Sequence, residues 1–537
     1  MSKDKSTETS GKTLLKSSFG MSFATLLSRI TGLVRVRLES TVFGGGDVAS
    51  AWFFAFAIAN LFRRVLGEGA IANALIPLIA DTDAQEGREK AKKQLAFVFL
   101  LLGAILAVIV LAGSLVSWLI LKYSPGWGIE FLNYPRIRMM FQLLIILMPY
   151  GLFICLTGVV GAVLNYAGSF MFPAMVSLLL NIVLLAGLSI AWGCAMSPGE
   201  FLPMLAWSVP ISGALQLLLV TLWMWKLGFF PNFRCFVQGK DICRKLWKLA
   251  FPGIVSYSVL QLSFVIDQSM AASLNSQAIP ALNYVYRIVD IPIGLVAVSF
   301  GTVLVATMSR AAAAGDIREI SRSLEFSLRV VWFVTLPLAA LIIFFHNNML
   351  HVLCLGGRYT NSDLQAAHWV AVFYSLGIPF FCSLKVLLPA FYSRKKMTTT
   401  LVVSSVATVL NIVLNYILMR RFAQGGIALA TVFSSIFQNA VLLWLLSREK
   451  MIANAVKTAL TFVRSATVSL GVAGGLHWVY LRCFEAWSSS HWSCELIFLA
   501  ALGTVFSIGY FGISYLLRSP ECSDVIAILM RKIRKKA

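Results

Sequence analysis

The stretch LAFVFLLLGAILAVIVLAGSLVSWLIL, residues 95–121, contains no charged side chain and decides the class of fold. A hydrocarbon core of about 30 Å is crossed by a helix of about 20 residues, so this stretch is long enough to span a membrane. Strands of a transmembrane β-barrel are about ten residues long and alternate apolar with polar residues, and this stretch does not alternate. The sequence therefore predicts a helical integral membrane protein.

Comparable apolar blocks recur along the whole chain. Of its 537 residues, 58% are hydrophobic and only 13% are charged, about half the charged fraction of a soluble domain. We count about fourteen predicted transmembrane helices. Their ranges are 19–43, 48–80, 94–122, 137–164, 171–194, 203–227, 246–274, 279–309, 325–347, 364–389, 398–420, 424–446, 460–482 and 494–517.

Lysine and arginine gather in every second loop between these blocks. Examples are the loops around 88–93, 234–245, 310–322 and 394–396, and the tail at 531–536. Cytoplasmic loops are the basic ones, so we expect both termini in the cytoplasm. The N-terminal residues are polar and basic, and we expect the first apolar block to be a retained span rather than a cleaved signal. Loop orientation and anionic lipid head groups explain the net charge of +22, so we expect membrane lipids and no nucleic acid as partners.

A weak internal symmetry suggests the domain organisation. A basic stretch, an apolar span, a short loop and an arginine-bearing span occur near the start of the chain and again after residue 245. Pseudo-symmetric halves are common in transporters. We therefore predict an N-terminal lobe of six helices at 1–236, a second six-helix lobe at 237–450, and two further helices with a basic tail at 451–537.

Arginines inside the predicted spans carry the functional information. Arg29 and Arg35 lie in the first span, Arg63 in the second and Arg287 in the eighth. Each costs at least about 2.5–3.5 kcal/mol at the bilayer centre, and too few acidic residues share these spans to neutralise them. We expect a water-filled cavity that binds an anion, for which the guanidinium fork matches phosphate or pyrophosphate. The alternative is that some of these arginines lie at interfaces or pair internally.

A second set of polar residues could bind a cation. Asn411 and Asn415 are four residues apart and lie on one helix face, and Asp267 and Thr431 could complete an oxygen-rich cage. Sodium prefers such oxygen ligands, so possible sodium coupling is the cofactor hypothesis. The alternative is that these residues only form hydrogen bonds between helices.

The remaining reactive side chains show no catalytic or metal-binding pattern. The nine cysteines lack metal-site spacing. Cys483 and Cys494 flank a short polar loop, and whether they form a disulfide is open. The five histidines lie at or beyond the ends of spans without a paired carboxylate motif. We therefore predict no catalytic residues.

Several segments carry a resemblance to a known family. They are SRITGLVRVRLESTVFGGG (28–46), NLFRRVLGEGAIANALIP (60–77), GAVLNYAGSFMFPAM (161–175), LNYVYRIVDIPIGLVAVSFGTVL (282–304), GGRYT (356–360) and LKVLLPAFYSR (384–394). Together they resemble the MurJ (MviN) family of lipid II flippases, which belongs to the multidrug/oligosaccharidyl-lipid/polysaccharide exporter superfamily.

The resemblance implies a transporter rather than an enzyme. The expected substrate is lipid II, an undecaprenyl-pyrophosphate-linked disaccharide-peptide of peptidoglycan synthesis, moved to the outer leaflet of the bacterial cytoplasmic membrane by a monomer that alternates its access. The family's cavity arginines fall on Arg29, Arg35, Arg63 and Arg287, and its sodium site falls on Asp267, Asn411, Asn415 and Thr431. The last two helices would shape a groove for the lipid tail.

Three other functions remain as alternatives. Two belong to the same superfamily, namely a flippase for a lipid-linked oligosaccharide and a cation-coupled drug exporter. The arginines would repel a cationic drug, and the segments 60–77 and 384–394 favour the MurJ-type family over the oligosaccharide carrier. The third is a membrane enzyme acting on a polyprenyl-linked lipid, which would need catalytic acids or histidines on sizeable loops.

Overall fold

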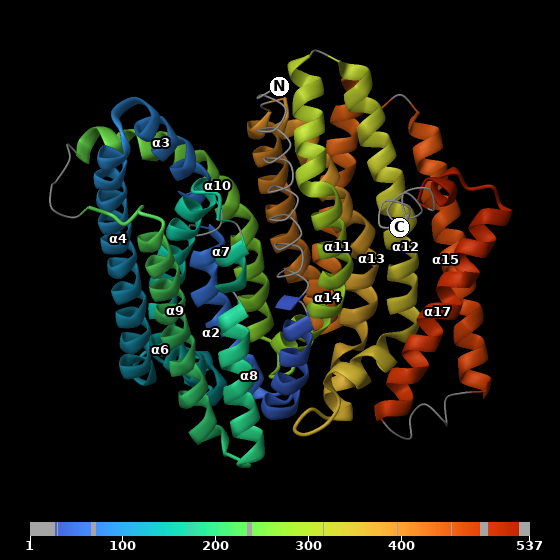
Figure 1. Ribbon diagram of the computed structural model, residues 1–537. Coiled ribbons are helices and arrows are strands. Elements are labelled where there is room, and N and C mark those ends of the chain that lie inside the picture. The colour runs from blue at the N-terminus through green and yellow to red at the C-terminus, as the bar shows by residue number, and fades with distance from the viewer. Residues whose placement is uncertain are drawn as a thin grey trace. The chain divides into compact units, whose positions relative to one another are not determined.

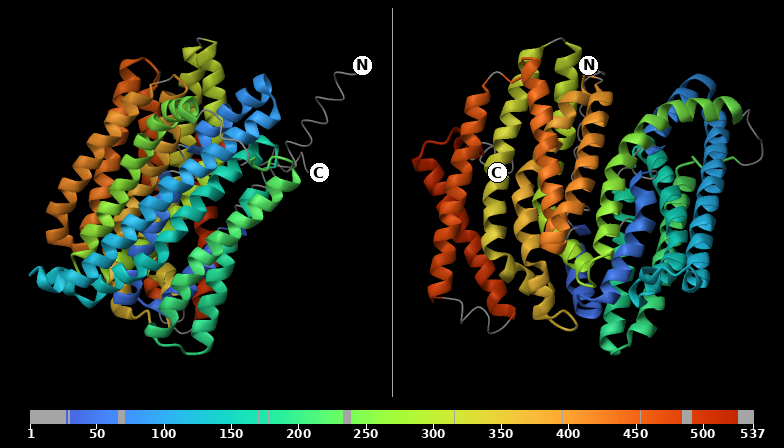
Figure 2. Two further views of the ribbon diagram at one scale, coloured as in Figure 1. Left: turned by 90° about the vertical axis from the view of Figure 1, so that its left-hand side faces the viewer. Right: turned by 180° about the vertical axis from the view of Figure 1, so that it is seen from behind.

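The computed structural model confirms an all-helical architecture, shown in Figures 1 and 2. It describes residues 27–28, 30–65, 71–169, 171–176, 178–232, 239–314, 316–394, 396–452, 454–483 and 492–525. Within these residues, ten helices are long and apolar enough to cross a membrane. The chain is therefore a multi-pass membrane protein. The total of about fourteen spans stays a prediction.

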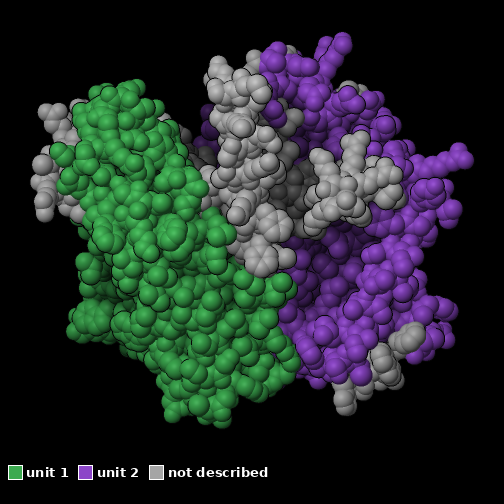
Figure 3. Space-filling model, viewed as in Figure 1, with its two compact units in different colours: residues 1–280, 356–359 green, residues 281–355, 360–537 purple. Residues whose placement is uncertain are grey.

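The chain divides into two compact units, coloured separately in Figure 3. Unit 1 comprises Met1–Pro280 with Gly356–Tyr359, and unit 2 comprises Ala281–Leu355 with Thr360–Ala537. Unit 1 thus includes the predicted seventh span. The predicted lobes follow chain symmetry rather than packing, so they remain a prediction.

Unit 1 is built around one long central helix. Its elements are a helical segment at 30–43, α2 (Asp47–Phe62), α3 (Ile71–Glu86), α4 (Arg88–Tyr123), the 3₁₀ turn η2 (Ser124–Gly126), α5 (Glu130–Asn133), α6 (Pro135–Tyr166), α7 (Met171–Val176), α8 (Leu178–Gly193), α9 (Pro198–Lys226) and α10 (Gly239–Ala272). Helix α6 packs against α2, α4 and α9, and Leu147, Val159 and Leu164 on it are fully buried. Because α6 is enclosed on several sides, its apolar residues are not confined to one stripe.

Unit 2 contains α11 (Ala278–Ala313, of which the first three residues belong to unit 1), α12 (Ile317–Cys354), α13 (Asn361–Tyr392), α14 (Met397–Arg448), α15 (Ala455–Cys483) and α17 (Trp492–Leu516). Helix α12 packs against α13, α15 and α17, and α13 packs against α14. Figure 1 shows α15 and α17 beside α12. Aromatic side chains fill this contact, with Phe333 5.1 Å from Tyr510 between ring centroids. Such ring pairs add to apolar burial.

The element α14 is a pair of antiparallel helices and not one rod. A straight helix rises 1.5 Å per residue, so residues 34 positions apart would be about 51 Å apart. Yet Gln438 Nε2 donates to Ser404 Oγ at 2.8 Å. The chain reverses at Ala423, whose φ is +46°. The two halves correspond to the predicted spans 398–420 and 424–446.

Candidate functional site

Arg35 lies inside unit 1 and not in open water. Its side chain is on the helical segment 30–43 and the residue is only 6% exposed. The Nε atom is 3.2 Å from Oε1 of Glu39, one helical turn away. Nη1 donates to Oδ1 of Asn181 on α8 at 2.9 Å. From the sequence we expected too few acidic residues to neutralise Arg35. In the structure Glu39 supplies a negative charge, so the positive charge of Arg35 is largely balanced in this conformation.

Arg63 and Arg64 are placed by a change of helix type. Residues 63–65 form a π-helical turn after the end of α2, and such turns are frequent at functional sites. Arg63 is half-buried, and its Nε donates to Asn60 Oδ1 at 2.7 Å.

The neighbouring Arg64 contacts helix α10. The Arg64 Nη1 atom donates to Gln261 Oε1 at 3.3 Å, and the Arg64 guanidinium carbon lies 5.3 Å from the ring centroid of Phe264. Arg64 is thus occupied by protein contacts, while Arg63 is fixed by a residue of its own helix.

The other two predicted arginines are placed differently. Arg287 is half-buried on α11 in unit 2, whereas Arg35 and Arg63 belong to unit 1. Arg29 lies outside the described residues. The grouping of all four arginines in one cavity therefore stays a prediction.

Three of the four predicted sodium ligands do lie together. Asn415 Nδ2 donates to Asn411 Oδ1 at 3.2 Å, and Asn411 Nδ2 donates to Thr431 Oγ1 at 3.3 Å. Thr431 Oγ1 in turn donates to the Ile427 carbonyl at 3.0 Å. The reversal of α14 brings these residues together from both halves of the hairpin.

The side chains of this cluster form a continuous chain of hydrogen bonds. Asn411 Oδ1 and Thr431 Oγ1 already accept hydrogen bonds from within the cluster. The fourth predicted ligand, Asp267, is buried on α10 in unit 1. Within the described part of the chain, no group of three or more His, Cys, Asp or Glu residues could hold a metal. Sodium binding therefore stays a prediction, and hydrogen bonding between helices is what unit 2 displays.

The GGRYT segment closes one end of unit 1. The Arg358 amide donates to the Thr41 carbonyl at 3.0 Å, and the Arg358 guanidinium donates to the Met196 carbonyl and lies 5.1 Å from the Phe201 ring centroid. Gly357 has φ +60°, and a Cβ atom there would lie 2.5 Å from the Thr41 carbonyl oxygen. The double glycine is therefore required for close packing, a role that the sequence signals but that we did not predict.

Two buried carboxylates fasten α12, α15 and α17 at opposite ends, and sequence reasoning missed both. Glu521 accepts from Thr461 Oγ1 at 2.8 Å and pairs with Arg464 on α15 and Arg329 on α12. Burial of Glu521 opposes its ionisation, but hydrogen bonds, including its own backbone amide and Thr461, together with Arg464, lower its pKa below the ordinary value.

At the other end, Glu495 accepts from Asn348 Nδ2 at 3.1 Å and pairs with His351. The histidines do therefore include one with a carboxylate partner, although the two residues are far apart in sequence. Cys483 and Cys494, for which a disulfide was left open, are both free thiols.

Known proteins resemble the chain over most of its length. The family model described as "Lipid II flippase MurJ" matches residues 40–497. A lipid II flippase MurJ of Burkholderia cenocepacia is 28% identical over 503 residues, which cover 92% of this chain and 95% of that protein.

Two solved structures share the fold. One, described as "Lipid II flippase MurJ, inward closed conformation", has a TM-score of 0.74 at 23% identity and covers 93% of this chain and 99% of its own. The other is an inward-facing multidrug resistance MATE family transporter of the MOP superfamily. It has a TM-score of 0.64 at 12% identity, and the match covers 79% of this chain and 96% of the transporter's chain. The likeness shows that the chain shares the fold of both. Because the family model spans nearly the whole described helical region, the chain belongs to the lipid II flippase MurJ family.

Proposed function

We propose that this protein moves lipid II from the cytoplasmic to the outer leaflet of a bacterial cytoplasmic membrane. The observation that carries the proposal is the match of the MurJ family model to residues 40–497. Within that range, Arg63 lies in a helix of membrane-spanning length and Arg287 lies in a span predicted from the sequence, where an arginine is costly. Both are half-buried rather than sealed in the core, as contact with a passing substrate requires.

In this mechanism Arg63 and Arg287 bind the pyrophosphate of the lipid. Guanidinium groups stay charged and match phosphate oxygens geometrically. Arg35 is more deeply buried and paired with Glu39, so it acts in the resting conformation mainly by fixing the first helix to α8. It contacts substrate only if the cavity opens to it. The bulky disaccharide-peptide would occupy the wet cavity and the lipid tail would stay in the bilayer.

The membrane potential favours outward transport of this substrate. Moving about two negative charges outward across a potential of ~100 mV, negative inside, is favourable by roughly 4–5 kcal/mol, at ~2.3 kcal/mol per charge. Such a gain drives transport without a bound ion, and sodium at Asn411, Asn415, Thr431 and Asp267 would add to it. The proposal further holds that the protein works as a monomer with both termini in the cytoplasm, as its basic loops predict.

The test replaces the native lipid II flippase of a bacterium with this chain. The readout is the fraction of lipid II that an impermeant reagent reaches at the outer leaflet. The native chain should restore this fraction, and Arg63→Ala should lower the flipping rate about ten- to a hundredfold, the worth of a charged hydrogen bond of ~1.5–3 kcal/mol. Arg63→Lys should retain part of the activity.

The control is Arg448→Gln, which removes an arginine at the end of α14 that stacks on Trp444. All variants are compared at equal membrane abundance. If the native chain restores no exposure of lipid II but does restore that of a lipid-linked oligosaccharide in a matching host, the oligosaccharide carrier becomes the function. If Arg63→Ala and the control behave alike, Arg63 is not a substrate contact.

A further inference from the structure

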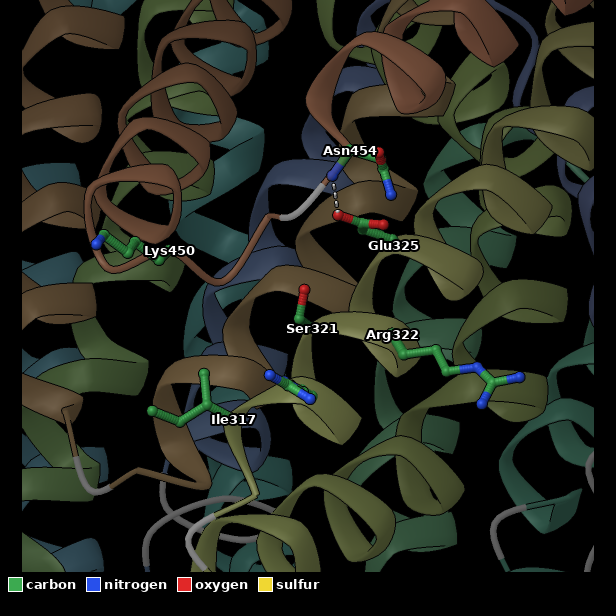
Figure 4. Close-up of a pocket in the computed structure, with 7 residues that line it drawn as sticks. Ile317, Ser321, Arg322, Glu325, Lys450 and Asn454 are labelled. Atoms are coloured by element: carbon green, nitrogen blue, oxygen red, sulfur yellow. Dashed lines mark hydrogen bonds between the residues drawn. The ribbon is translucent and has the colours of Figure 1, made fainter.

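A small basic pocket in unit 2 lies apart from the arginines considered so far. It is formed by the first turns of α12 and by Lys450 and Asn454 of the linker between α14 and α15. Its volume is about 240 Å³, which is below the ~300–1,000 Å³ of pockets for drug-sized ligands. Figure 4 shows Ser321 and Glu325 on α12 and Lys450 and Asn454 on the linker. A ligand for this pocket is therefore the size of a small head group.

The charges that line the pocket come from both segments. Arg318 and Arg322 lie one turn apart on α12, and Lys450 comes from the linker. All three are exposed, and no ion pair joins any of them to another residue in the described part of the chain. Glu325 is the one acid in the lining, and its Oε1 accepts the Asn454 amide at 2.7 Å. The lining is thus positive overall, and its carboxylate is engaged by the linker that it fixes.

The floor of the pocket contains a buried hydroxyl. Ser321 is only 6% exposed, and no described residue forms a hydrogen bond with its Oγ atom. Elsewhere in this unit, buried hydroxyls such as Thr335 and Ser375 donate to the carbonyl four residues back. A buried hydroxyl without a partner costs free energy, so the arrangement leaves a donor available to a ligand in the pocket.

The backbone conformation of Lys450 is a further indication that the charge of this side chain has a function. This residue has φ +55°, and its amide and that of Met451 close the end of α14 by bonding to the Ser447 and Leu446 carbonyls. Helix ends of this type favour glycine, because other side chains are strained at positive φ. A lysine held in a strained backbone is a reason to look for a function of its charge.

We propose that this pocket binds a phosphate group, with Arg318, Arg322 and Lys450 as the cations and Ser321 as a hydroxyl donor. Two sources share this chemistry, the head group of an anionic phospholipid and free inorganic phosphate. Helix α12 is interrupted by non-helical backbone at Phe345. The part before this kink has 28 residues and is about 42 Å long, which is still beyond the ~30 Å hydrocarbon core. Its first turns can thus lie at head-group depth, on the cytoplasmic side in the orientation that the basic loops predict. The proposal does not depend on which lipid the protein transports.

The experiment measures lipid binding to the full chain purified in detergent, by native mass spectrometry. Phosphatidylglycerol is compared with phosphatidylcholine, whose quaternary ammonium the three cations repel. The native protein should bind phosphatidylglycerol about tenfold more tightly or better. Arg318→Gln with Arg322→Gln should remove this preference, and Ser321→Ala should weaken it severalfold.

Lys450→Gly separates binding from folding. Glycine relieves the strained backbone, so this variant should keep or raise the melting temperature while binding phosphatidylglycerol roughly tenfold more weakly, equal to about 1.4 kcal/mol. The matched control is Lys457→Gln, which removes an exposed cation on the first turn of α15 that does not line the pocket.

Millimolar inorganic phosphate forms the second arm. If it displaces phosphatidylglycerol from the native protein, the pocket takes free phosphate, and if it does not, the lipid head group is the ligand. The proposal is overturned if the pocket variants bind phosphatidylglycerol as the native protein does. It is also overturned if Lys457→Gln loses as much binding as they do, because diffuse surface charge would then explain the effect. None of these measurements requires transport, so failure here leaves the flippase proposal standing, and the reverse is also true.

Discussion

Arg35 illustrates how one side chain can combine a structural and a functional charge. It is buried, its nearest acid is Glu39 at 3.2 Å, and Asn181 accepts a further hydrogen bond. Removing one partner from a buried ion pair leaves an uncompensated charge, which costs about 3–5 kcal/mol. The consequences of losing Arg35 or Glu39 should therefore appear first in stability.

We expect Glu39→Gln to lower the melting temperature of the purified protein strongly, because Arg35 then keeps its charge without a partner. The double variant Arg35→Met, Glu39→Met should recover most of the loss, since a buried pair replaced by apolar residues is often neutral. Thermal unfolding followed by size-exclusion fluorescence measures both. A Glu39→Gln protein as stable as the native one would contradict the buried pair, and transport by the stable double variant would show that Arg35 is dispensable for binding.

The sequence predicts the arginines of the candidate site but not their partners. Their cost in a membrane depends only on residue type and position in an apolar block, so Arg35 and Arg63 can be selected from the sequence alone. The Asn181 contact joins residues 146 positions apart, and no local pattern encodes it. The same limit hid Glu521 and Glu495, whose partners lie on helices distant in sequence.

Among the helices, the predicted reversal between spans 398–420 and 424–446 is the best-tested feature of the fold. The apolar blocks fixed the two spans, yet the turn itself carries no proline and has Ala423 at its strained position. The glycines that signal a turn, Gly425 and Gly426, come just after it. A Cβ atom on Gly426 would lie 2.3 Å from the Leu418 carbonyl oxygen, so this glycine permits the close approach of the two halves.

We expect Ala423→Gly to stabilise the protein by about 1 kcal/mol, because glycine relieves ~1–3 kcal/mol of backbone strain and loses somewhat more chain entropy. Gly426→Ala should destabilise it, since the added methyl group has no room. Gly503→Ala serves as the control, as a Cβ atom there meets nothing within 4 Å. The melting temperatures of the three variants test both expectations. A Gly426→Ala protein as stable as the native one would mean that the two halves of the hairpin are less closely packed at Gly426 than described.

The contact of α12 with α15 and the segment after α17 should depend on pH through Glu521. Its pKa is lower in the folded protein than the ordinary value of 4.5, so the folded state gains stability from its ionised form. That stability is fully present above about pH 4.5 and is lost as the pH falls through the lower, folded value. We expect thermal stability to fall below pH 4.5 and Glu521→Gln to flatten that fall, measured as the difference in melting temperature between pH 6 and pH 4. Equal slopes for the two proteins would exclude Glu521 as the titrating group.

For the whole molecule, composition and the length of the apolar blocks were sufficient for the fold class, and the segments that resemble the MurJ family were sufficient for the family. The helices of membrane-spanning length and the all-helical architecture of the described residues confirm the first prediction, and the family match confirms the second. The division into two units could not be predicted from the sequence, because it depends on which helices pack together. The segment Gly356–Tyr359 belongs to unit 1 although both of its flanks belong to unit 2, and contacts with residues distant in sequence, such as Thr41 and Met196, hold it there.

The Glu521 cluster also has a consequence for biosynthesis. Arg329 and Arg464 enter the membrane long before the ribosome has made the carboxylate that neutralises them. At about 5–20 residues per second, the interval between Arg329 and Glu521 is on the order of tens of seconds. During that time the nascent chain holds first Arg329 and then also Arg464 without their final partner, and a product truncated before residue 521 never completes the pairing. A finished chain therefore differs from one truncated before residue 521 in having the carboxylate that pairs with Arg329 and Arg464.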